Sequence, residues 1–264
     1  MTTRILIASF ALLFTLLPSV QTTNAQIVGS NFLDDSLVDV NTTTADLTFR
    51  ASTTPDLFGL AYDSNDGIVF GSSLDALYTL DINDGTTSLV GDLGFNAVGG
   101  LSFGSSASSL FGVSINGQNS DFLSVNRDTG NASFIASVAG RLDSLTYVPS
   151  LDRLFSVNID QGTLVSIDPS NGSATSVGSV GTFNALAYDG NRNRIFGIDS
   201  FTDDLISINP LDASTTTIGP TGINSGNFAA LGGLVNVTSV PEPSSLALAL
   251  LAASVMATHR RKAA

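Results

Sequence analysis

The sequence of 264 residues lacks cysteine and tryptophan, and its single histidine, His259, lies close to the C-terminus. Residues 26–239 therefore contain neither thiol nor imidazole. This excludes a Ser-His-Asp triad, a cysteine nucleophile and any His-ligated transition-metal site in that part of the chain. It also excludes disulfide bonds, so a hydrophobic core has to hold the fold together. We predict no catalytic residue from these residue types.

Residues 26–239 also lack lysine, glutamate and methionine, because Glu242 and Lys262 lie in the tail and both methionines lie outside this range. These three residue types favour helices. The same range is rich in Val, Ile, Thr, Phe, Ser, Gly and Asn, which favour strands and turns. The composition predicts an all-β fold.

Positive charge is scarce as well. Residues 26–239 hold six arginines against twenty-two aspartates, which gives a net charge near −16. A field of this sign repels nucleic acid and anionic lipid and favours cations. We therefore expect no nucleic-acid partner, and contact with a membrane only through the terminal segments.

The N-terminal residues have the pattern of a secretory signal peptide. Arg4 precedes an apolar run over residues 5–17, and Thr23 and Ala25 are small residues at the two positions that a signal peptidase reads. We predict that residues 1–25 are a signal peptide cleaved before Gln26. The alternative is an uncleaved anchor, although the apolar run is shorter than the roughly 20 residues of a spanning helix.

The C-terminal residues 240–264 have a different order of features. The motif Pro241-Glu242-Pro243 comes first, an apolar run over residues 246–258 follows, and the basic residues Arg260, Arg261 and Lys262 form a stop. This order resembles the PEP-CTERM sorting tail. The resemblance implies export to the cell envelope or beyond, transient anchoring through the apolar segment, and processing by an exosortase after signal peptidase has acted. It says nothing about activity.

The residues between the two signals contain an internal repeat. A first apolar segment recurs around five leucines, and each of the first four copies is followed by two further apolar runs, a polar turn and a Ser/Thr-rich run. Four strands in a period of about 40 to 45 residues are typical of a propeller blade. The five leucines, which are 41, 44, 41 and 45 residues apart, are Leu60, Leu101, Leu145, Leu186 and Leu231.

Counting these segments predicts five blades. Residues 37–49 supply the later strands of a blade that has no first strand, and the copy beginning at residue 229 supplies a first strand alone. We predict that residues 26–239 form a five-bladed β-propeller whose ring is closed by strands from both ends, which removes an exposed sheet edge. An open β-solenoid and a two-sheet sandwich are the alternatives. The repeat L-[YVI]-x-[LI]-[DN]-x-x-[TN]-G resembles quinoprotein-like and NHL-like bacterial propellers, and this resemblance implies the fold alone.

Two sets of side chains recur at fixed places in the repeat. Tyr62, Phe103, Tyr147 and Tyr188 lie on the predicted first strands, where we expect them to pack in the core. Aspartates precede each predicted third strand, and a ring of carboxylates on one face would suit Ca²⁺ or a cationic partner. The alternative is that aspartate simply favours loops. The five aspartates are Asp35, Asp75, Asp121, Asp160 and Asp204.

Two functions remain open at the level of the sequence. The first is a non-catalytic binding or scaffold module at the cell surface or in the extracellular matrix, whose partner is an extracellular polysaccharide or another surface protein. The second is an extracellular hydrolase of the lactonase or glycosidase type that uses aspartates with a bound cation. No cofactor is indicated apart from the Ca²⁺ considered above, and the metal-binding residues stay undefined.

Overall fold

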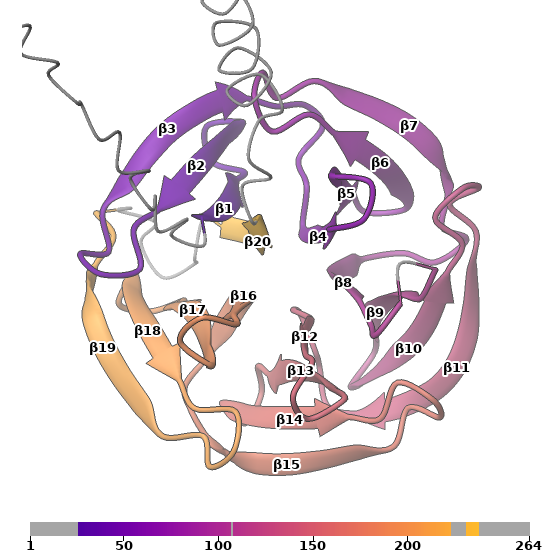
Figure 1. The fold of residues 1–264 in the computed structure, drawn as a ribbon. Helices are drawn as coiled ribbons and strands as arrows, with labels where there is room; N and C mark the ends of the chain where they lie inside the picture. Colours follow the sequence, from indigo (N-terminus) through magenta and orange to yellow (C-terminus); the bar gives the residue numbers. More distant parts are fainter. Residues whose placement is uncertain (1–25, 107, 223–230, 238–264) are drawn as a thin grey trace, which may run out of the picture.

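The computed structural model describes residues 26–106, 108–222 and 231–237, and this part of the chain is all-β (Figure 1). Twenty strands form five four-stranded antiparallel sheets arranged around a central axis, with no helix among the described residues. The predicted five-bladed propeller is confirmed. The predicted signal peptide and the predicted sorting tail both lie outside the described residues.

The shared blade is also confirmed. In blade 1 the sheet order is β20, β1, β2, β3, so the C-terminal strand is the innermost strand and three N-terminal strands follow it outwards. Blades 2 to 5 each use four consecutive strands. The strands of blade 1 are β20 (Leu231–Val237), β1 (Gln26–Asn31), β2 (Ser36–Val40) and β3 (Leu47–Ser52).

The bounds of the remaining strands follow the repeat. Those of blade 2 are β4 (Gly59–Asp63), β5 (Ile68–Ser72), β6 (Ala76–Leu80) and β7 (Thr87–Asp92). Those of blade 3 are β8 (Val98–Phe103), β9 (Leu110–Asn116), β10 (Asn119–Val125) and β11 (Ala132–Ala139). Those of blade 4 are β12 (Thr146–Val148), β13 (Arg153–Asn158), β14 (Thr163–Ile167) and β15 (Ala174–Ser179). Those of blade 5 are β16 (Phe183–Asp189), β17 (Arg194–Asp199), β18 (Asp204–Ile208) and β19 (Thr215–Pro220).

One position in the repeat needs correction. Leu60 and Leu101 lie opposite Gly71 and Gly112 on the second strands of their blades. In blade 1 the equivalent second-strand glycine lies opposite Leu234, not Leu231. The prediction placed the last copy three residues too early because an Ala-Leu pair resembles the start of the motif. The true copy begins with a Gly-Gly pair, as it does in blade 3.

The core lies between the blades. Five clusters of buried apolar residues occur, one for each pair of neighbouring blades. Every third strand has a large residue that is 0% exposed at the same position of the repeat, and burying each such side chain contributes about 1.5–3 kcal/mol. These third-strand residues are Leu37, Leu77, Phe122, Leu164 and Leu205.

The turn between the third and fourth strands joins each blade to the one before it. An Asn or Asp begins the turn, and its carbonyl accepts the N–H of a residue with left-handed φ four positions later. A Cβ added to Gly85 would lie 1.8 Å from the carbonyl oxygen of Ser52, at the end of β3. This contact explains the glycine in the repeat motif. The left-handed residues are Ala45, Gly85, Gly130, Gly172 and Ala213.

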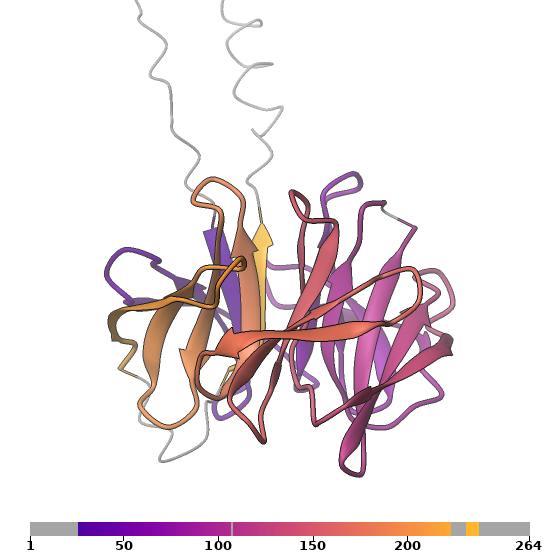
Figure 2. The same ribbon diagram turned by 90° about the horizontal axis from the view of Figure 1, so that it is seen from below.

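The two faces of the ring differ. Gln26 pairs with Val237, so the beginning of β1 and the end of β20 lie side by side on one face, which we call the terminal face (Figure 2). Connections between first and second strands lie on the same face because neighbouring strands are antiparallel. Connections between second and third strands, and from each fourth strand to the next blade, lie on the opposite side, the distal face.

Candidate functional site

The five aspartates named from the repeat all lie towards the distal face, but not at equivalent positions. The buried third-strand residue provides the reference point. Asp35 and Asp75 come two residues before it, Asp121 and Asp204 come one residue before it, and Asp160 comes four residues before it. The register therefore does not arrange these five side chains as a regular ring.

Their immediate surroundings also differ. Asp160 forms an ion pair with Arg141, whereas Asp121 accepts a hydrogen bond from Asn116 Nδ2 at 3.0 Å. Asp35 faces Asp56, and burial, together with the hydrogen bond and charge of Asp35, raises the pKa of Asp56. Among the described residues, no group of three or more acids or histidines is close enough to hold a metal ion. Cation binding at this face stays a prediction.

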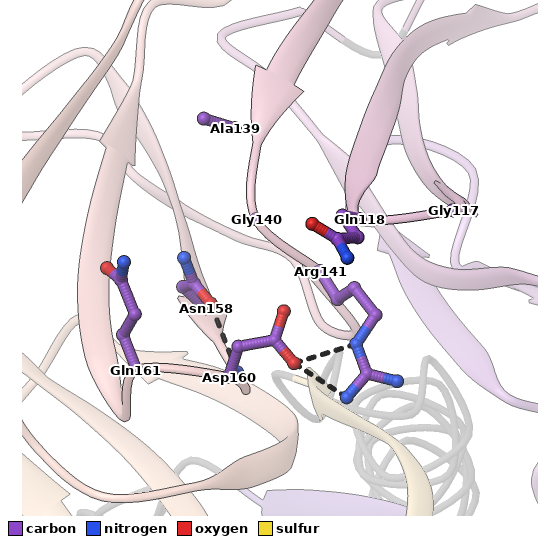
Figure 3. A pocket seen from close by; sticks show the side chains of 8 residues that line it. All are labelled: Gly117, Gln118, Ala139, Gly140, Arg141, Asn158, Asp160 and Gln161. Atoms are coloured by element: carbon purple, nitrogen blue, oxygen red, sulfur yellow. Dashed lines mark hydrogen bonds and ion pairs between the residues drawn. The ribbon is translucent and has the colours of Figure 1, made fainter.

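A cleft lies between blades 3 and 4 on the distal face (Figure 3). Its volume is about 680 Å³, and polar side chains and backbone line it. We call it the blade 3–4 cleft. Its lining residues are Gly117, Gln118, Ala139, Gly140, Arg141, Asn158, Asp160 and Gln161.

Three connections build this cleft. The β9–β10 turn contributes Gln118, the connection after β11 contributes Gly140 and Arg141, and the β13–β14 turn contributes residues 158–161. Gly140 has φ of 90°, and a Cβ added there would lie 2.0 Å from the Asn158 amide nitrogen. Glycine therefore lets the backbone pass close to the Asn158 side chain. This close approach sets the position of the next residue, Arg141.

Arg141 and Asp160 form the charged centre of the cleft. Arg141 donates from Nε at 2.8 Å and from Nη2 at 2.6 Å, and both bonds reach Asp160 Oδ1. The guanidinium lowers the pKa of Asp160, and the carboxylate raises the pKa of Arg141. Both side chains are about 40% exposed, so solvent screens the pair and its contribution to stability is small.

Amide groups surround this pair. Asn158 is only 5% exposed, and its Oδ1 accepts the N–H of Asp160 at 3.1 Å, which fixes the start of the turn. Gln118 and Gln161 are exposed and lie on opposite sides of the cleft (Figure 3). The cleft thus offers amide donors and acceptors beside one carboxylate and one guanidinium, a set suited to hydrogen-bonding hydroxyl groups.

Arg141 is the only arginine in the described distal-face connections. The excess of carboxylates there disfavours an anionic ligand because like charges repel. A neutral or cationic ligand fits this face better. The aspartates in the same connections are Asp34, Asp35, Asp56, Asp75, Asp143, Asp160 and Asp203.

Asp143 follows Arg141 by two residues, and among the described residues its carboxyl group has the most strongly shifted pKa. Burial raises its pKa to about 6, and the charge of Arg141 opposes this shift. A Cβ added to Gly99 on β8 would lie 2.2 Å from its Oδ1, so the carboxyl group packs against the preceding blade. The sequence analysis did not single out Asp143. The available signal was an acid two residues before the repeated leucine, where the other blades have Phe58, Gly99, Asn184 and Gly232.

A second cavity of about 310 Å³ opens on the axis at the terminal face. The residues two positions after each repeated leucine line it, and four of the five are aromatic. We call this cavity the axial cup. Its five equivalent residues are Tyr62, Phe103, Tyr147, Tyr188 and Asn236.

Most of the polar groups of the cup have partners. The Tyr147 hydroxyl donates to Asp152 at 2.6 Å, and the Tyr188 hydroxyl donates to Asn193 at 2.7 Å. Burial and the neighbouring carboxylate raise the pKa of Tyr147. The expected core packing of the four aromatic residues is confirmed, because each packs against an inter-blade cluster. Their remaining exposed surface lines the cavity.

The fold and the tail together define the class of this protein, a five-bladed propeller that carries a sorting signal. Residues 239–262 match the family model of the PEP-CTERM protein-sorting motif. The predicted tail is thereby confirmed, and it marks an exported protein. The match covers only this segment, which lies outside the described residues. No curated protein sequence matches the chain.

Solved structures share the fold of the body. A chain of the nidogen/laminin complex is 15% identical with a TM-score of 0.56, over 82% of this chain and 86% of that one. A chain from work on the de novo evolutionary emergence of a symmetrical protein is 16% identical with a TM-score of 0.55, over 81% and 98%. TolB from Acinetobacter baumannii is 15% identical with a TM-score of 0.52, over 77% of this chain and 55% of that one. At these identities the likeness concerns the fold alone.

In the described residues we find no helix long and apolar enough to cross a membrane.

Proposed function

We propose that this chain is an exported, non-catalytic binding module of the cell envelope or extracellular matrix, which holds a neutral polysaccharide in the blade 3–4 cleft. The observation that carries the proposal is the group of Arg141, Asn158 and Asp160 in the lining of a polar cavity of about 680 Å³. Sugar hydroxyls are both donors and acceptors, and amides, carboxylates and guanidinium groups can bind them from the same cleft.

The position of the cleft supports this function. Gln26 and Val237, where the two terminal segments join the body, pair on the terminal face, whereas the cleft opens on the distal face. A protein held by its tail therefore presents the cleft away from the attachment point. Ligand binding then does not depend on whether the tail is retained or cleaved.

Binding of the full-length protein to a panel of neutral and anionic polysaccharides tests the proposal. We expect Arg141→Gln and Asp160→Asn each to weaken binding to a neutral polymer at least about tenfold, because a lost hydrogen bond to a charged group costs about 1.5–3 kcal/mol. The matched control is Asp204→Asn, which removes one charge from the same face in another blade. Equal loss in Asp160→Asn and Asp204→Asn would mean that the net charge of the face, and not the cleft, determines binding.

A second function, an extracellular hydrolase of the glycosidase or lactonase type, is favoured by one observation. The pKa of Asp143 is raised to about 6, while that of Asp160 is lowered, and both carboxyl groups lie near Arg141. Carboxyl groups whose pKa values are pushed apart are typical of an acid and base pair. In this reading Asp143 donates a proton and Asp160 stays ionised.

Release of reducing ends or of a hydroxy acid from candidate polymers and lactones separates the two functions. A hydrolase loses turnover but keeps its ligand in Asp143→Asn, which removes the proton donor without changing the shape. A binding module shows no turnover in either form, with calcium added or with a chelator present.

A further inference from the structure

The axial cup lies where the sorting tail leaves the body. Asn236 lines the cavity, and Val237, the last residue of β20, comes directly after it. Pro241 is four residues further on, and an extended chain spans about 14 Å over that distance. The Pro-Glu-Pro motif can therefore reach the rim of the cup without any change in the propeller.

The chemistry of the cup suits a proline-rich segment. Tyr62, Phe103, Tyr147 and Tyr188 present four half-buried aromatic side chains around one small cavity. Proline-rich segments in the polyproline II conformation dock in aromatic grooves, since their rings pack on aromatic faces and little conformational entropy is lost. Residues 240–244 have the sequence Val-Pro-Glu-Pro-Ser, with one proline on each side of the glutamate.

A hydrogen-bond acceptor in the cup also lacks a partner. Asn236 donates through Nδ2 to the carbonyl oxygen of Tyr188 at 2.9 Å, but its Oδ1 is buried without a donor. A buried acceptor left unpaired is unfavourable, because it has lost its hydrogen bonds to water without replacing them. The segment that follows, Thr238 and Ser239, carries both N–H and hydroxyl donors.

We propose that the segment Val240–Pro243 of this chain docks in the axial cup of its own propeller. The folded body then shields the Pro-Glu-Pro motif, and the processing enzyme has to compete with the cup for it. This inference does not depend on the blade 3–4 cleft, so its failure leaves the proposed binding function untouched.

Because the chain has no cysteine, a single introduced thiol reports on the tail. Ser239→Cys in the full-length protein places this thiol between β20 and the motif, and its alkylation rate measures how often the segment is free. If the segment is docked about four-fifths of the time, alkylation is about fivefold slower than in the undocked chain. A synthetic peptide of residues 238–250 with the same thiol gives the undocked rate.

Two sets of variants test the contact from both sides. Pro241→Ala with Pro243→Ala, and separately Tyr147→Leu with Tyr188→Leu, should each restore the fast rate. Tyr78→Leu is the control, because this fourth tyrosine lies on β6 outside the cup. The proline variant cannot unfold the body, so it decides the outcome if the tyrosine variant is unstable. A thiol that already reacts at the peptide rate, or a slow rate unchanged by both sets, would overturn the proposal.

Discussion

At the scale of single residues, the ion pairs of the propeller differ in how much they contribute to stability. Arg127, at the turn after β10, bonds to Asp63 and Asp66 of blade 2 and stacks over Phe70 and Phe103. The Asp63 side chain is 1% exposed, whereas both partners of the pair in the blade 3–4 cleft are about 40% exposed. We therefore expect the burial of the partner carboxylate, and not the N–O distance of the ion pair, to determine how much stability is lost when each arginine is replaced.

Arg127→Met should therefore destabilise the protein by about 3–5 kcal/mol, since it leaves a buried carboxylate without its counterion. Urea unfolding followed by circular dichroism measures this. Arg141→Gln, the exposed counterpart, should change the free energy of unfolding by less than about 1 kcal/mol. Adding Asp63→Asn to Arg127→Met should recover part of the loss. Similar losses for the two arginines would show that burial is not the deciding factor.

Asp143 makes the stability of the folded protein depend on pH. Its pKa is about 6 in the folded state against 3.8 as the ordinary value, so the folded state binds more protons between these limits and stability falls as pH rises. Asp143→Asn should remove the penalty and be more stable than the parent by about 3 kcal/mol at pH 7.5, with no advantage below about pH 3. Unfolding at both pH values, with Asp75→Asn as control, checks this. An advantage that is equal at both pH values would argue against burial of the charge as its cause.

At the scale of elements, the turn between third and fourth strands links the blades. Gly85 has φ of 78°, and a Cβ there would collide with the backbone of Ser52 in the preceding blade. Gly67, in the β4–β5 turn, has φ of 72° but open space around it. The two glycines thus have the same backbone conformation and different surroundings.

Gly85→Ala should destabilise the protein by at least about 2 kcal/mol more than Gly67→Ala, because both variants carry the left-handed strain but only the first one also displaces a neighbouring blade. Thermal unfolding of the two variants against the parent gives the difference. Equal losses would mean that backbone strain alone explains the glycine of the repeat.

The elements also show what the sequence could predict. The repeated leucines and the apolar third-strand runs predicted the blades and the shared blade, because inter-blade packing imposes the same pattern five times. Leu234 was not predicted as the last repeated leucine because an insertion displaces the last copy of the repeat. The blade 3–4 cleft was not predicted because Gln118, Arg141 and Asp160 lie in connections whose sequences do not repeat. Asp143 was also missed, but it could have been found, because an acid at a repeated position was visible in the sequence.

At the scale of the whole molecule, the two terminal segments join the body at one pair of strands. The predicted signal-peptide cleavage before Gln26 would leave β1 complete, since that strand begins at this residue. The body 26–237 is thus a closed ring with both terminal segments joined to it at one point of the terminal face.

Removing residues 240–264 should move the exported protein from the cell envelope to the medium, since we predict that the apolar run and basic stop anchor it. Fractionation of cells that express the two forms measures the change, and mass spectrometry of the exported protein should find Gln26 at its N-terminus. A distribution between fractions that is the same for both forms would show that the tail does not determine location.

The pairing of Gln26 with Val237 also has a mechanical consequence. Force applied between the tail and the distal face runs along β20, because this strand begins towards the distal face and ends at the terminal face. Such a force loads the hydrogen bonds of the β1–β20 ladder together, in shear, and bonds loaded together resist more than bonds loaded one after another. A molecule tethered by its tail and pulled from its distal face would therefore yield only when the whole ladder slips at once.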